Sequence, residues 1–509
     1  MQGTHPLLEE RAEQIRYRDF ILDDFQVEAI GHINEGKSVL VSAPTGVGKT
    51  LIADYLIDRA ILRGDRIIYT APIKALSNQK FKEFKALYGP ERVGIITGDV
   101  VINPLADVAI MTTEIFRNIL HQDPGRLTGI SHVIFDEIHY LSDEDRGTVW
   151  EESIIFMPAE MRLLGLSATI PNAEELAAWI AEIKGHEVAV VKKRERAVPL
   201  HHHLYERHLG PTNMAEVKKY LDRATEDPAV AAAVRQSTRH VDLIKYVAKN
   251  RGLPCLYFVF SRRLCEEMAY ELAGLRSFLN PEETILVEAL VEKYYAEYGL
   301  NELKHLVEVK GVLARGIAFH HAGLLPALKE IVETLFGLGL IKVMYATETF
   351  AVGINYPVKT VCFDSPTKFD GFTFRPMTTL EYFQMAGRAG RRGIDPRGTV
   401  YLLVDFPRFR AAEYPSTREE DILPLESRFE LSFNTVLNLK RRYKTEEIHL
   451  ILDRNFATFQ AKNERARREE ELRAARAEAA ELRARLCPDN AAPLCPHNYR
   501  RRKTRLQKR

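Results

Sequence analysis

A glycine-rich segment, residues 43–50 (APTGVGKT), lies between an apolar run and a helical pattern. A phosphate-binding loop requires this context of strand, loop and helix. Gly46 and Gly48 let backbone N–H groups converge on a phosphate, and Lys49 adds a positive charge beside it. Thr50 offers a hydroxyl to Mg²⁺, and the N-terminal end of the following helix attracts the anion. The segment therefore predicts a site for ATP with Mg²⁺, although its glycine spacing departs from the commonest loop, G-x-x-x-x-G-K.

Two acidic residues, Asp136 and Glu137, directly follow the apolar run 132–135 (HVIF). A carboxylate at the end of a buried strand can reach the same Mg²⁺, so Asp136 is predicted to hold the metal through water. Glu137 can polarise the water that attacks the phosphate. The structural alternative is an acidic pair that caps a helix. The phosphate loop upstream in the chain makes that alternative the weaker one.

Two arginines, Arg388 and Arg391, lie in the segment 384–393 (QMAGRAGRRG). At helical spacing they are one turn apart and share a face. Two guanidinium groups aimed at one anion suit the charge that develops on the γ-phosphate during hydrolysis. Gln384, one further turn back, is placed to hold the attacking water. The alternative is a solvated basic helix, but the small residues between the arginines favour close approach to another surface.

The elements that must position these residues form two repeats of one pattern. Short apolar runs alternate with amphipathic helical segments such as 50–63 and 73–87, which predicts mostly parallel sheets covered by helices. The runs are 38–42, 66–70, 108–111 and 132–135 in the first repeat, and 256–260, 317–319, 342–345, 360–363 and 400–404 in the second. We predict two α/β domains, residues 1–198 and 199–405, joined near residues 196–206. ATP would bind in the cleft between them, and hydrolysis would open and close it.

Helical segments dominate outside these repeats. The polar, Ala-rich segment 209–249 predicts an insertion or the entry to the second domain. Segments 429–442 and 445–460 predict helices of a third, smaller region, residues 406–460. Segment 461–486 consists largely of Ala, Glu, Arg and Leu and predicts a long charged helix, either single and exposed or one arm of a coiled coil. Residues 461–509 end in a basic tail.

The composition is ordinary for a globular chain of several domains. It has 509 residues, 46% hydrophobic and 28% charged, with a net charge of +1. A near-zero net charge neither supports nor excludes a polyanionic partner, since basic groups can line one channel. Five cysteines indicate a reducing compartment. The sequence has no signal-peptide core and no long apolar run, so we expect a soluble, cytoplasmic protein without a membrane partner.

Taken in order, these segments and several others resemble the motifs of superfamily 2 helicases, specifically the superkiller-type, exosome-assisting DExH RNA helicases. The resemblance runs from about Phe20 to Gln460. The matching segments are FQ (25–26), APTGVGKT (43–50), APIKALSNQ (71–79), TGD (97–99), TTE (112–114), DEIH (136–139), SAT (167–169), FVFSRR (258–263), HHAGLLP (320–326), TETFAVGIN (347–355) and QMAGRAGRRG (384–393). Two longer segments, 135–154 and 427–439, resemble the RNA-acting branch and the start of its winged-helix domain. The implied fold is α/β, with two tandem RecA-like parallel-sheet domains, a small helical or winged-helix region and a long charged helix.

The resemblance assigns a role to each matched residue. Contacts to ATP fall to Phe25, Gln26, Thr45, Gly46, Val47, Gly48, Lys49, Thr50, Asp136 and Gly353, with Thr50 and Asp136 on the Mg²⁺ side. Hydrolysis falls to Glu137, Gln384, Arg388 and Arg391. The phosphates of a single strand would be held around Pro72, Lys74, Gly98, Thr113, Ser261 and Thr347 by sequence-neutral contacts. Ser167 and Thr169 would transmit the nucleotide state to that strand.

The resemblance also implies an activity. It is ATP-driven movement, 3′ to 5′, on single-stranded or 3′-tailed RNA, with an exoribonuclease complex as candidate partner. Segment 368–374 (KFDGFTF) holds a hairpin turn signal at Asp370-Gly371. In this family a hairpin there wedges the duplex apart; the alternative is an edge hairpin whose aromatic rings pack inward. The family's helical bundle after the winged helix has no counterpart here, so we expect a minimal or truncated member.

Weaker signals leave several alternatives open. Cys487, Cys495 and His497 could start a zinc site, but with an unusual spacing. Residues 201–203 are three histidines in an extended segment, where neighbours point to opposite faces and chelate poorly. The basic tail is either a nucleic-acid patch or a solvated end. The alternative functions are a DNA helicase of the same architecture and an RNA-binding, ATP-gated clamp without processive unwinding. The sequence predicts no oligomeric state.

Overall fold

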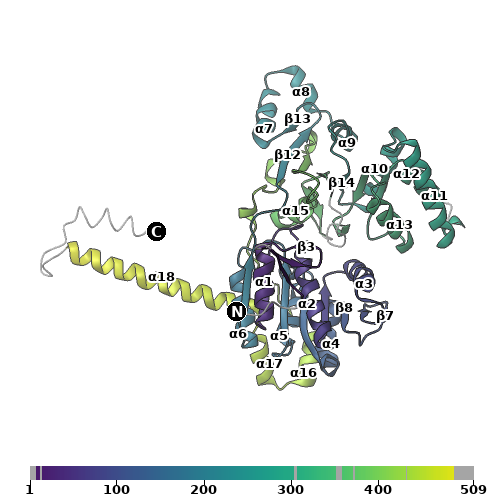
Figure 1. Ribbon diagram of the computed structural model, residues 1–509. Helices are drawn as coiled ribbons and strands as arrows, with labels where there is room; N and C mark the ends of the chain where they lie inside the picture. Colours follow the sequence, from purple (N-terminus) through teal and green to yellow (C-terminus); the bar gives the residue numbers. More distant parts are fainter. Residues whose placement is uncertain are drawn as a thin grey trace. The chain divides into compact units, whose positions relative to one another are not determined.

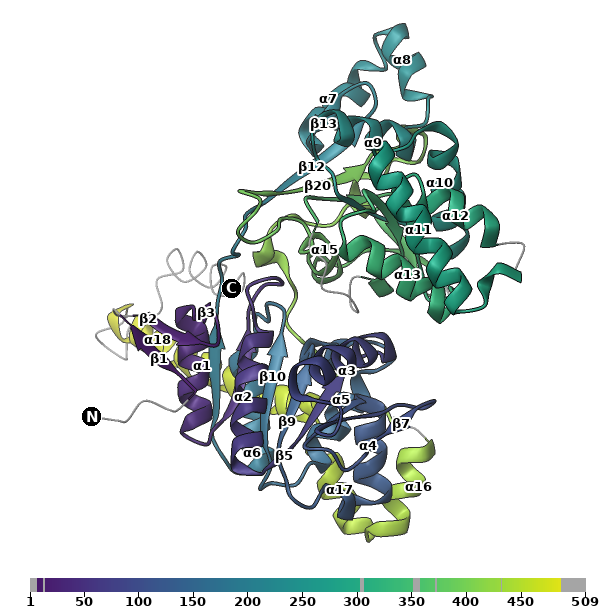
Figure 2. The ribbon, with the colours of Figure 1, turned by 45° about the vertical axis from the view of Figure 1, so that its right-hand side comes forward.

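The computed structural model describes residues 7–11, 14–302, 306–350, 358–370, 373–431 and 433–486. The chain divides into two compact units, Met1–Leu431 and Ser432–Arg509, which are described separately. The first unit holds two large sheets of mostly parallel strands, shown in Figures 1 and 2. The predicted fold class, two RecA-like parallel-sheet domains with a helical C-terminal region, is confirmed.

The first sheet has eight strands in the order β11-β4-β10-β9-β5-β8-β6-β7. They are β4 Ser38–Ser42, β5 Arg66–Ala71, β6 Val93–Ile96, β7 Val101–Ile102, β8 Val108–Thr112, β9 Ile130–Asp136, β10 Arg162–Ser167 and β11 Val188–Lys192. All neighbours pair in parallel except β6 and β7. Every residue of β4 and β8 is buried, as expected for continuous apolar strands covered on both faces.

Six helices accompany this sheet. They are α1 Asp24–Asn34, α2 Thr50–Arg63, α3 Lys74–Tyr88, α4 Thr113–Gln122, α5 Gly147–Phe156 and α6 Ala173–Lys184, with the short 3-10 helices η1 Pro124–Leu127 and η2 Ile138–Ser142. Helices α1, α2 and α3 share one apolar cluster that contains Phe25, Tyr55 and Phe84. Gly64, in the left-handed conformation, ends α2 at the residue where the sequence predicted its end.

A small antiparallel sheet precedes α1, where the sequence had predicted no element. Its strands are β1 Glu9–Arg11, β2 Gln14–Tyr17 and β3 Phe20–Ile21. Arg18, which follows β2, donates to the carboxylate of Asp58 on α2 at 2.8 Å. The buried Tyr17 hydroxyl bonds the same carboxylate. The N-terminal segment is therefore attached to the helix that follows the phosphate loop.

The second sheet has seven strands in the order β13-β12-β20-β17-β14-β16-β15. They are β12 Leu200–Glu206, β13 Gly210–Thr212, β14 Cys255–Phe258, β15 Ile317–His320, β16 Val343–Ala346, β17 Thr360–Phe363 and β20 Gly398–Leu403. The chain passes from one sheet to the other between Lys192 and Leu200. The free thiols of Cys255, Cys265 and Cys362 are buried in this domain.

The helices of the second domain flank its sheet, and α7, α8 and α9 lie within the predicted insertion. They are α7 Met214–Arg223, α8 Pro228–Val234, α9 His240–Lys249, α10 Arg262–Leu275, α11 Pro281–Glu297, α12 Val307–Leu313, α13 Pro326–Gly337 and α15 Thr379–Ala386, with η3 Leu300–Glu302. A two-stranded hairpin, β18 Thr367–Phe369 with β19 Phe374–Pro376, lies before α15. Short 3-10 turns follow β20: η5 Phe406–Arg408, η6 Ala411–Glu413 and η7 Glu419–Asp421.

The second unit contains α16 Phe433–Arg442, α17 Thr445–Leu452 and α18 Phe456–Leu486. The prediction of one helix over 445–460 was wrong, because α17 ends at Leu452. The Asn455 side chain accepts the backbone N–H of Thr458 at 2.7 Å and so starts a new helix. Residues 461–478 of α18 are exposed, and pairs such as Arg465–Glu469 stabilise it along its surface. Among the described residues, no helix has the length and apolar character to cross a membrane.

Candidate nucleotide cleft and strand-binding edge

The topology of the first sheet brings the predicted site residues to one edge. The phosphate loop follows β4, Ser167 ends β10, and Asp136 ends β9. Pro72, Gly98 and Thr113 follow β5, β6 and β8. Carboxyl ends of parallel strands lie at the same edge of a sheet, where ligands bind in open α/β folds. The strand order β4-β10-β9-β5-β8-β6 therefore separates the nucleotide residues from the strand-binding residues along that edge.

The phosphate loop depends on its two glycines. Gly46 and Gly48 have φ of +85° and +91°, values that residues with a Cβ rarely adopt. A Cβ on Gly48 would also meet the amide nitrogen of Gln26 at 2.9 Å. That amide donates to the Gly48 carbonyl at 2.9 Å, so Gln26 on α1 holds the loop. Phe25 beside it is buried, with the Lys193 ammonium 5.5 Å from its ring.

Lys49 lies at the centre of the cleft's charges. Its ammonium donates to the backbone carbonyls of Ala43 at 2.6 Å and Pro44 at 3.0 Å. Burial lowers the pKa of Lys49 to about 8, while the charges of Glu137 and Asp136 oppose that shift. Lys49 therefore lies close to both acidic residues, and α2 begins at the next residue, Thr50.

Asp136 is the predicted ligand on the Mg²⁺ side. Burial, together with the charge of Glu137, raises the pKa of Asp136 to about 6, and the Tyr69 hydroxyl donates to its carboxylate at 2.5 Å. Carboxylate and hydroxyl oxygens, as on Asp136 and Thr50, are ligands that suit Mg²⁺. No group of three or more His, Cys, Asp or Glu within the described ranges could hold a metal alone. One carboxylate and one hydroxyl supply only part of the octahedral ligand shell of Mg²⁺, so this donor pair fits an ion that takes its remaining ligands from phosphate and water.

The backbone of Glu137 is unusual. Its φ is +60°, in the left-handed region, which is uncommon for a residue other than glycine. Such strain persists where the surrounding structure over-determines it, and it clusters at functional sites. One carboxylate oxygen of Glu137 lies 3.4 Å from Nδ1 of His139.

His139 connects three of the predicted motifs. Its Nδ1 lies 3.2 Å from the Ser167 hydroxyl, and its Nε2 lies 2.5 Å from the Gln384 side-chain nitrogen. The ring is buried, and burial lowers its pKa to about 3, so it is neutral. The sequence identified His139 only as part of a motif and gave it no role.

The prediction that Arg388 and Arg391 share one face of a helix was wrong. Helix α15 ends at Ala386, because the Val358 N–H donates to the Arg388 carbonyl and Ala389 then pairs with Val358 as a β-bridge. The two side chains therefore have different partners. Burial lowers the pKa of Arg388, opposed by Glu137 and Asp136, so it lies near the acidic pair. Arg391 instead pairs with Asp395 at 2.7 Å.

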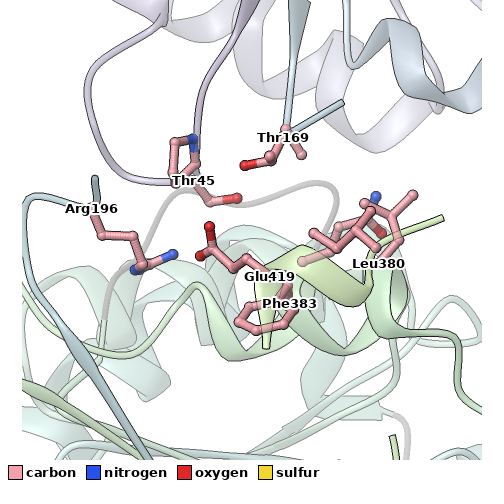
Figure 3. A pocket seen from close by; sticks show the side chains of 10 residues that line it. Thr45, Thr169, Arg196, Leu380, Phe383 and Glu419 are labelled. Carbon is pink, nitrogen blue, oxygen red and sulfur yellow. The ribbon is translucent and has the colours of Figure 1, made fainter. Parts of the chain in front are cut away.

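The sequence analysis missed three charged residues at the same place. Arg392 pairs with Asp23 at 3.2 Å and donates to the Val47 carbonyl at 3.3 Å, so it joins the second domain to the phosphate loop. Arg196 and Glu419 line a cavity of about 20 Å³ shown in Figure 3. The other lining residues are Pro44, Thr45, Ala168, Thr169, Leu380, Phe383, Gln384 and Ile422. Neither Arg196 nor Glu419 belongs to a recognised motif, so no local signal pointed to them.

Comparison with known proteins identifies this set of motifs. The sequence model of the DEAD/DEAH box helicase family matches residues 23–176. The human exosome RNA helicase MTR4 is 41% identical over 469 residues, which cover 87% of this chain and 44% of the human protein. The ATP-dependent RNA helicase mtr4 of Schizosaccharomyces pombe is 40% identical, with 87% and 42% covered. The antiviral helicase SKI2 of Saccharomyces cerevisiae is 37% identical, with 83% and 38% covered.

Residues 23–176 thus carry a DEAD/DEAH box helicase domain, and most of the chain is similar to superkiller-type RNA helicases. The resemblance predicted from the motifs is thereby confirmed. The chain spans less than half the length of these three relatives.

Two of the four predicted strand contacts at the edge of the first sheet, Lys74 and Gly98, are exposed, and Pro72 and Thr113 are buried. The Lys74 ammonium pairs with Asp99 at 2.6 Å, with Gly98 beside them. Thr113 is buried, and its hydroxyl donates to the Ala71 carbonyl at 3.5 Å, so its side chain is not presented to a ligand. The Pro72 carbonyl accepts a hydrogen bond from Arg146 at 2.7 Å.

Two further predicted contacts lie at the second sheet. Ser261 follows β14 and caps α10, where its hydroxyl accepts the N–H of Leu264 at 3.4 Å. Thr347 follows β16, and its hydroxyl lies 3.0 Å from that of Thr349. Since β14 and β16 are neighbours, both residues lie at one edge of the second sheet. Their role in strand binding stays a prediction.

The predicted hairpin before α15 is present. Strands β18 and β19 pair antiparallel, with Phe369 opposite Phe374. The alternative of inward-packed rings is wrong for these two residues, because their exposed fractions are 50% and 78%. Gly371 lies outside the described residues. So do Gly353, Cys487, Cys495 and His497, and their predicted roles stay untested.

The segment 422–430 returns from the second sheet to the first domain and gives the family's long motif a structural role. The backbone of Leu425 exchanges hydrogen bonds with the Asn172 side chain at 2.7 and 3.0 Å. The Ser427 hydroxyl donates to the buried Glu151 carboxylate at 2.6 Å. A Cβ on Gly147 would meet the Arg428 Cβ at 2.7 Å. Gly147 and Glu151 of segment 135–154 thus contact this segment.

Proposed function

We propose that this chain is an ATP-dependent RNA helicase or translocase that moves 3′ to 5′ on single-stranded RNA. The observation that carries the proposal is the contact between Gln384 of α15 and His139 of the DEIH motif. Residues from both RecA-like domains meet there, beside the phosphate loop. A cleft built from both domains can open and close as nucleotide binds, is hydrolysed and leaves. The names of the relatives, which are RNA helicases, favour RNA over DNA.

Each residue of the cleft then has a defined task. The amides of residues 45–50 and the Lys49 ammonium would bind the phosphates, and Phe25 and Gln26 would lie near the base. Glu137 would orient and deprotonate the attacking water, with Gln384 as its second contact. Arg388 and Arg391 would offset the charge that develops on the transferred phosphoryl group. Mg²⁺, held at Thr50 and Asp136, would neutralise charge on the phosphate oxygens.

The strand would cross the edge formed by residues after β5, β6 and β8 and by those after β14 and β16. Its contacts would be to phosphates and therefore neutral to sequence. The exposed rings of Phe369 and Phe374 would separate the duplex ahead of it. An exoribonuclease complex is the partner that the relatives' names favour, and a reducing, cytoplasmic location is consistent with the free thiols.

The test is steady-state ATP hydrolysis without nucleic acid, with single-stranded RNA and with single-stranded DNA, at one salt concentration. Fixed salt matters because phosphate contacts are strongly salt-dependent. We expect stimulation by RNA alone, and unwinding of a 3′-tailed duplex but not of a 5′-tailed one. Equal stimulation by DNA would replace the proposal with a general translocase. Stimulation without unwinding would indicate an ATP-gated clamp.

A further inference from the structure

Arg196 and Glu419 lie outside all the motifs, yet both line the cavity beside the phosphate loop. Arg196 belongs to the connection between β11 and β12, and Glu419 is the first residue of η7, after the second sheet. Figure 3 shows the Glu419 carboxylate between the Arg196 side chain and Thr45. The Glu419 carboxylate thus lies beside the phosphate loop, where the proposed function requires a phosphate to bind.

The position of Arg196 is fixed by backbone carbonyls. Its guanidinium donates to the carbonyl of Gly387 at 2.9 Å and to that of Val198 at 3.3 Å. A Cβ on Gly387 would meet Thr45 at 3.1 Å and Arg196 at 3.2 Å. Gly387, in segment 384–393, therefore lies next to both Arg196 and Thr45 of the phosphate loop.

Several cations converge at this point. Burial is the main cause of the lowered pKa of Lys49, and the charges of Arg388 and Arg196 lower it further. Burial likewise lowers the pKa of Arg196, and Glu419 is the carboxylate that opposes this shift. A cluster of positive groups in a partly buried cleft needs an anion close by. Glu419 lines the same cavity as Arg196, and its charge favours the charged form of that guanidinium.

The cavity leaves little room beside these groups. Its volume of about 20 Å³ is close to the space that one water needs. A phosphate oxygen that approached Arg196 past Thr45 would meet the Glu419 carboxylate. Two like charges at contact distance repel strongly in a partly buried site. Phosphate and Glu419 therefore exclude each other at Arg196.

We propose that Glu419 is a positioning residue that takes the place of the terminal phosphate of ATP against Arg196. The inference rests on the proposed use of ATP. When ATP binds, its terminal phosphate replaces the carboxylate, and Glu419 withdraws with η7. The segment that carries Glu419 continues directly to Leu425 and Ser427, which bond the first domain. Replacement of the Glu419 carboxylate by phosphate at Arg196 thereby displaces the segment 419–427, which contacts both domains.

Glu419→Gln tests the exchange, with Glu420→Gln as the matched control. Both variants remove one negative charge in the same turn, but Glu420 is exposed. The dissociation constants of a non-hydrolysable ATP analogue and of ADP are measured by titration in Mg²⁺ at fixed salt. We expect Glu419→Gln to tighten the ATP analogue by about fivefold or more, the lower end of usual coupling between sites. ADP, which lacks the terminal phosphate, should change much less, and Glu420→Gln should change neither.

Arg196→Gln completes a double-mutant cycle. In that background Glu419→Gln should no longer tighten the ATP analogue, because the cation for which the two anions compete is gone. Equal shifts for Glu419→Gln and Glu420→Gln, or equal shifts for ATP analogue and ADP, would overturn the inference while leaving the ATPase proposal intact. Loss of all nucleotide binding in the unmodified chain would instead overturn the proposed function. Far-UV circular dichroism verifies that each variant is folded.

Discussion

The side-chain amide of Gln384 lies 2.5 Å from Nε2 of His139, whose Nδ1 lies 3.2 Å from the Ser167 hydroxyl. Because the ring is neutral, the amide donates to Nε2 and the ring hydrogen lies on Nδ1. A single arrangement of protons thus connects α15 of the second domain with the ends of β9 and β10. Gln384 is thus connected through His139 to Ser167, which is the residue predicted to transmit the nucleotide state.

His139→Ala should therefore uncouple hydrolysis from RNA. We expect ATP affinity to stay within about twofold, while RNA stimulation of kcat falls about tenfold, the effect of losing roughly one hydrogen bond's coupling energy. The measurement is kcat for ATP with and without single-stranded RNA. His132→Ala is the control, because His132 lies in β9 rather than η2 and its Nδ1 lies 2.9 Å from the Ser131 hydroxyl. Undiminished stimulation in His139→Ala would exclude the coupling role.

The same histidine makes the first domain sensitive to acid. The folded-state pKa of His139, about 3, lies below the unfolded value of 6.5. Between these two pH values the unfolded chain binds more protons, so the free energy of unfolding falls as the pH falls. From pH 6.5 to 5 this group should contribute about 2 kcal/mol of that loss.

Urea unfolding followed by tryptophan fluorescence measures this effect. The two tryptophans of the sequence, Trp150 and Trp179, lie in α5 and α6 of the first domain, so the signal reports the domain that contains His139. His139→Gln should be less sensitive to acid than the unmodified chain. An unchanged difference between pH 7 and pH 5 would mean that His139 is not the group responsible.

Glu137→Gln should abolish turnover and preserve binding of ATP and RNA. The change removes the proposed base but leaves Asp136, Thr50 and Lys49 in place to bind the nucleotide. Single-turnover hydrolysis and titration with an ATP analogue separate the two effects. Near-normal turnover in this variant would show that another group activates the water.

Much of this arrangement could be predicted from the sequence, because the information is local. The strands are continuous apolar runs, and the positive φ of Gly46 and Gly48 follows from their residue type. The end of α15 could not be predicted, since it depends on the β-bridge between Ala389 and Val358. The pairing of His139 with Gln384 spans 245 residues of sequence. Such long-range contacts leave no trace in local periodicity.

The two arginines of the last motif should differ in a measurable way. Removing either Arg388 or Arg391 is expected to slow hydrolysis by about 10³-fold or more, as for other arginine fingers. Arg391, however, must leave the carboxylate of Asp395 before it can reach a phosphate. Asp395→Asn should therefore weaken this competing pair and retain hydrolysis, with kcat measured for all three variants. If kcat fell as much in Asp395→Asn as in Arg391→Ala, the ion pair between Arg391 and Asp395 would itself be needed for hydrolysis.

Gly147→Ala tests whether the absence of a side chain at Gly147 is needed for the packing of segment 422–430. The added Cβ would meet the Leu141 carbonyl oxygen at 2.3 Å and the Arg428 Cβ at 2.7 Å. Backbone atoms cannot yield cheaply, so we expect a loss of about 1–3 kcal/mol in the unfolding of the first domain, as for other overpacked sites. Gly31→Ala in α1 is the control, since its Cβ would meet nothing within 4 Å. Gly31→Ala should stabilise the domain by about 0.5–1 kcal/mol. Opposite changes in the free energy of unfolding of the two variants, measured by tryptophan fluorescence, would support the steric role of Gly147. Changes in the same direction would contradict it.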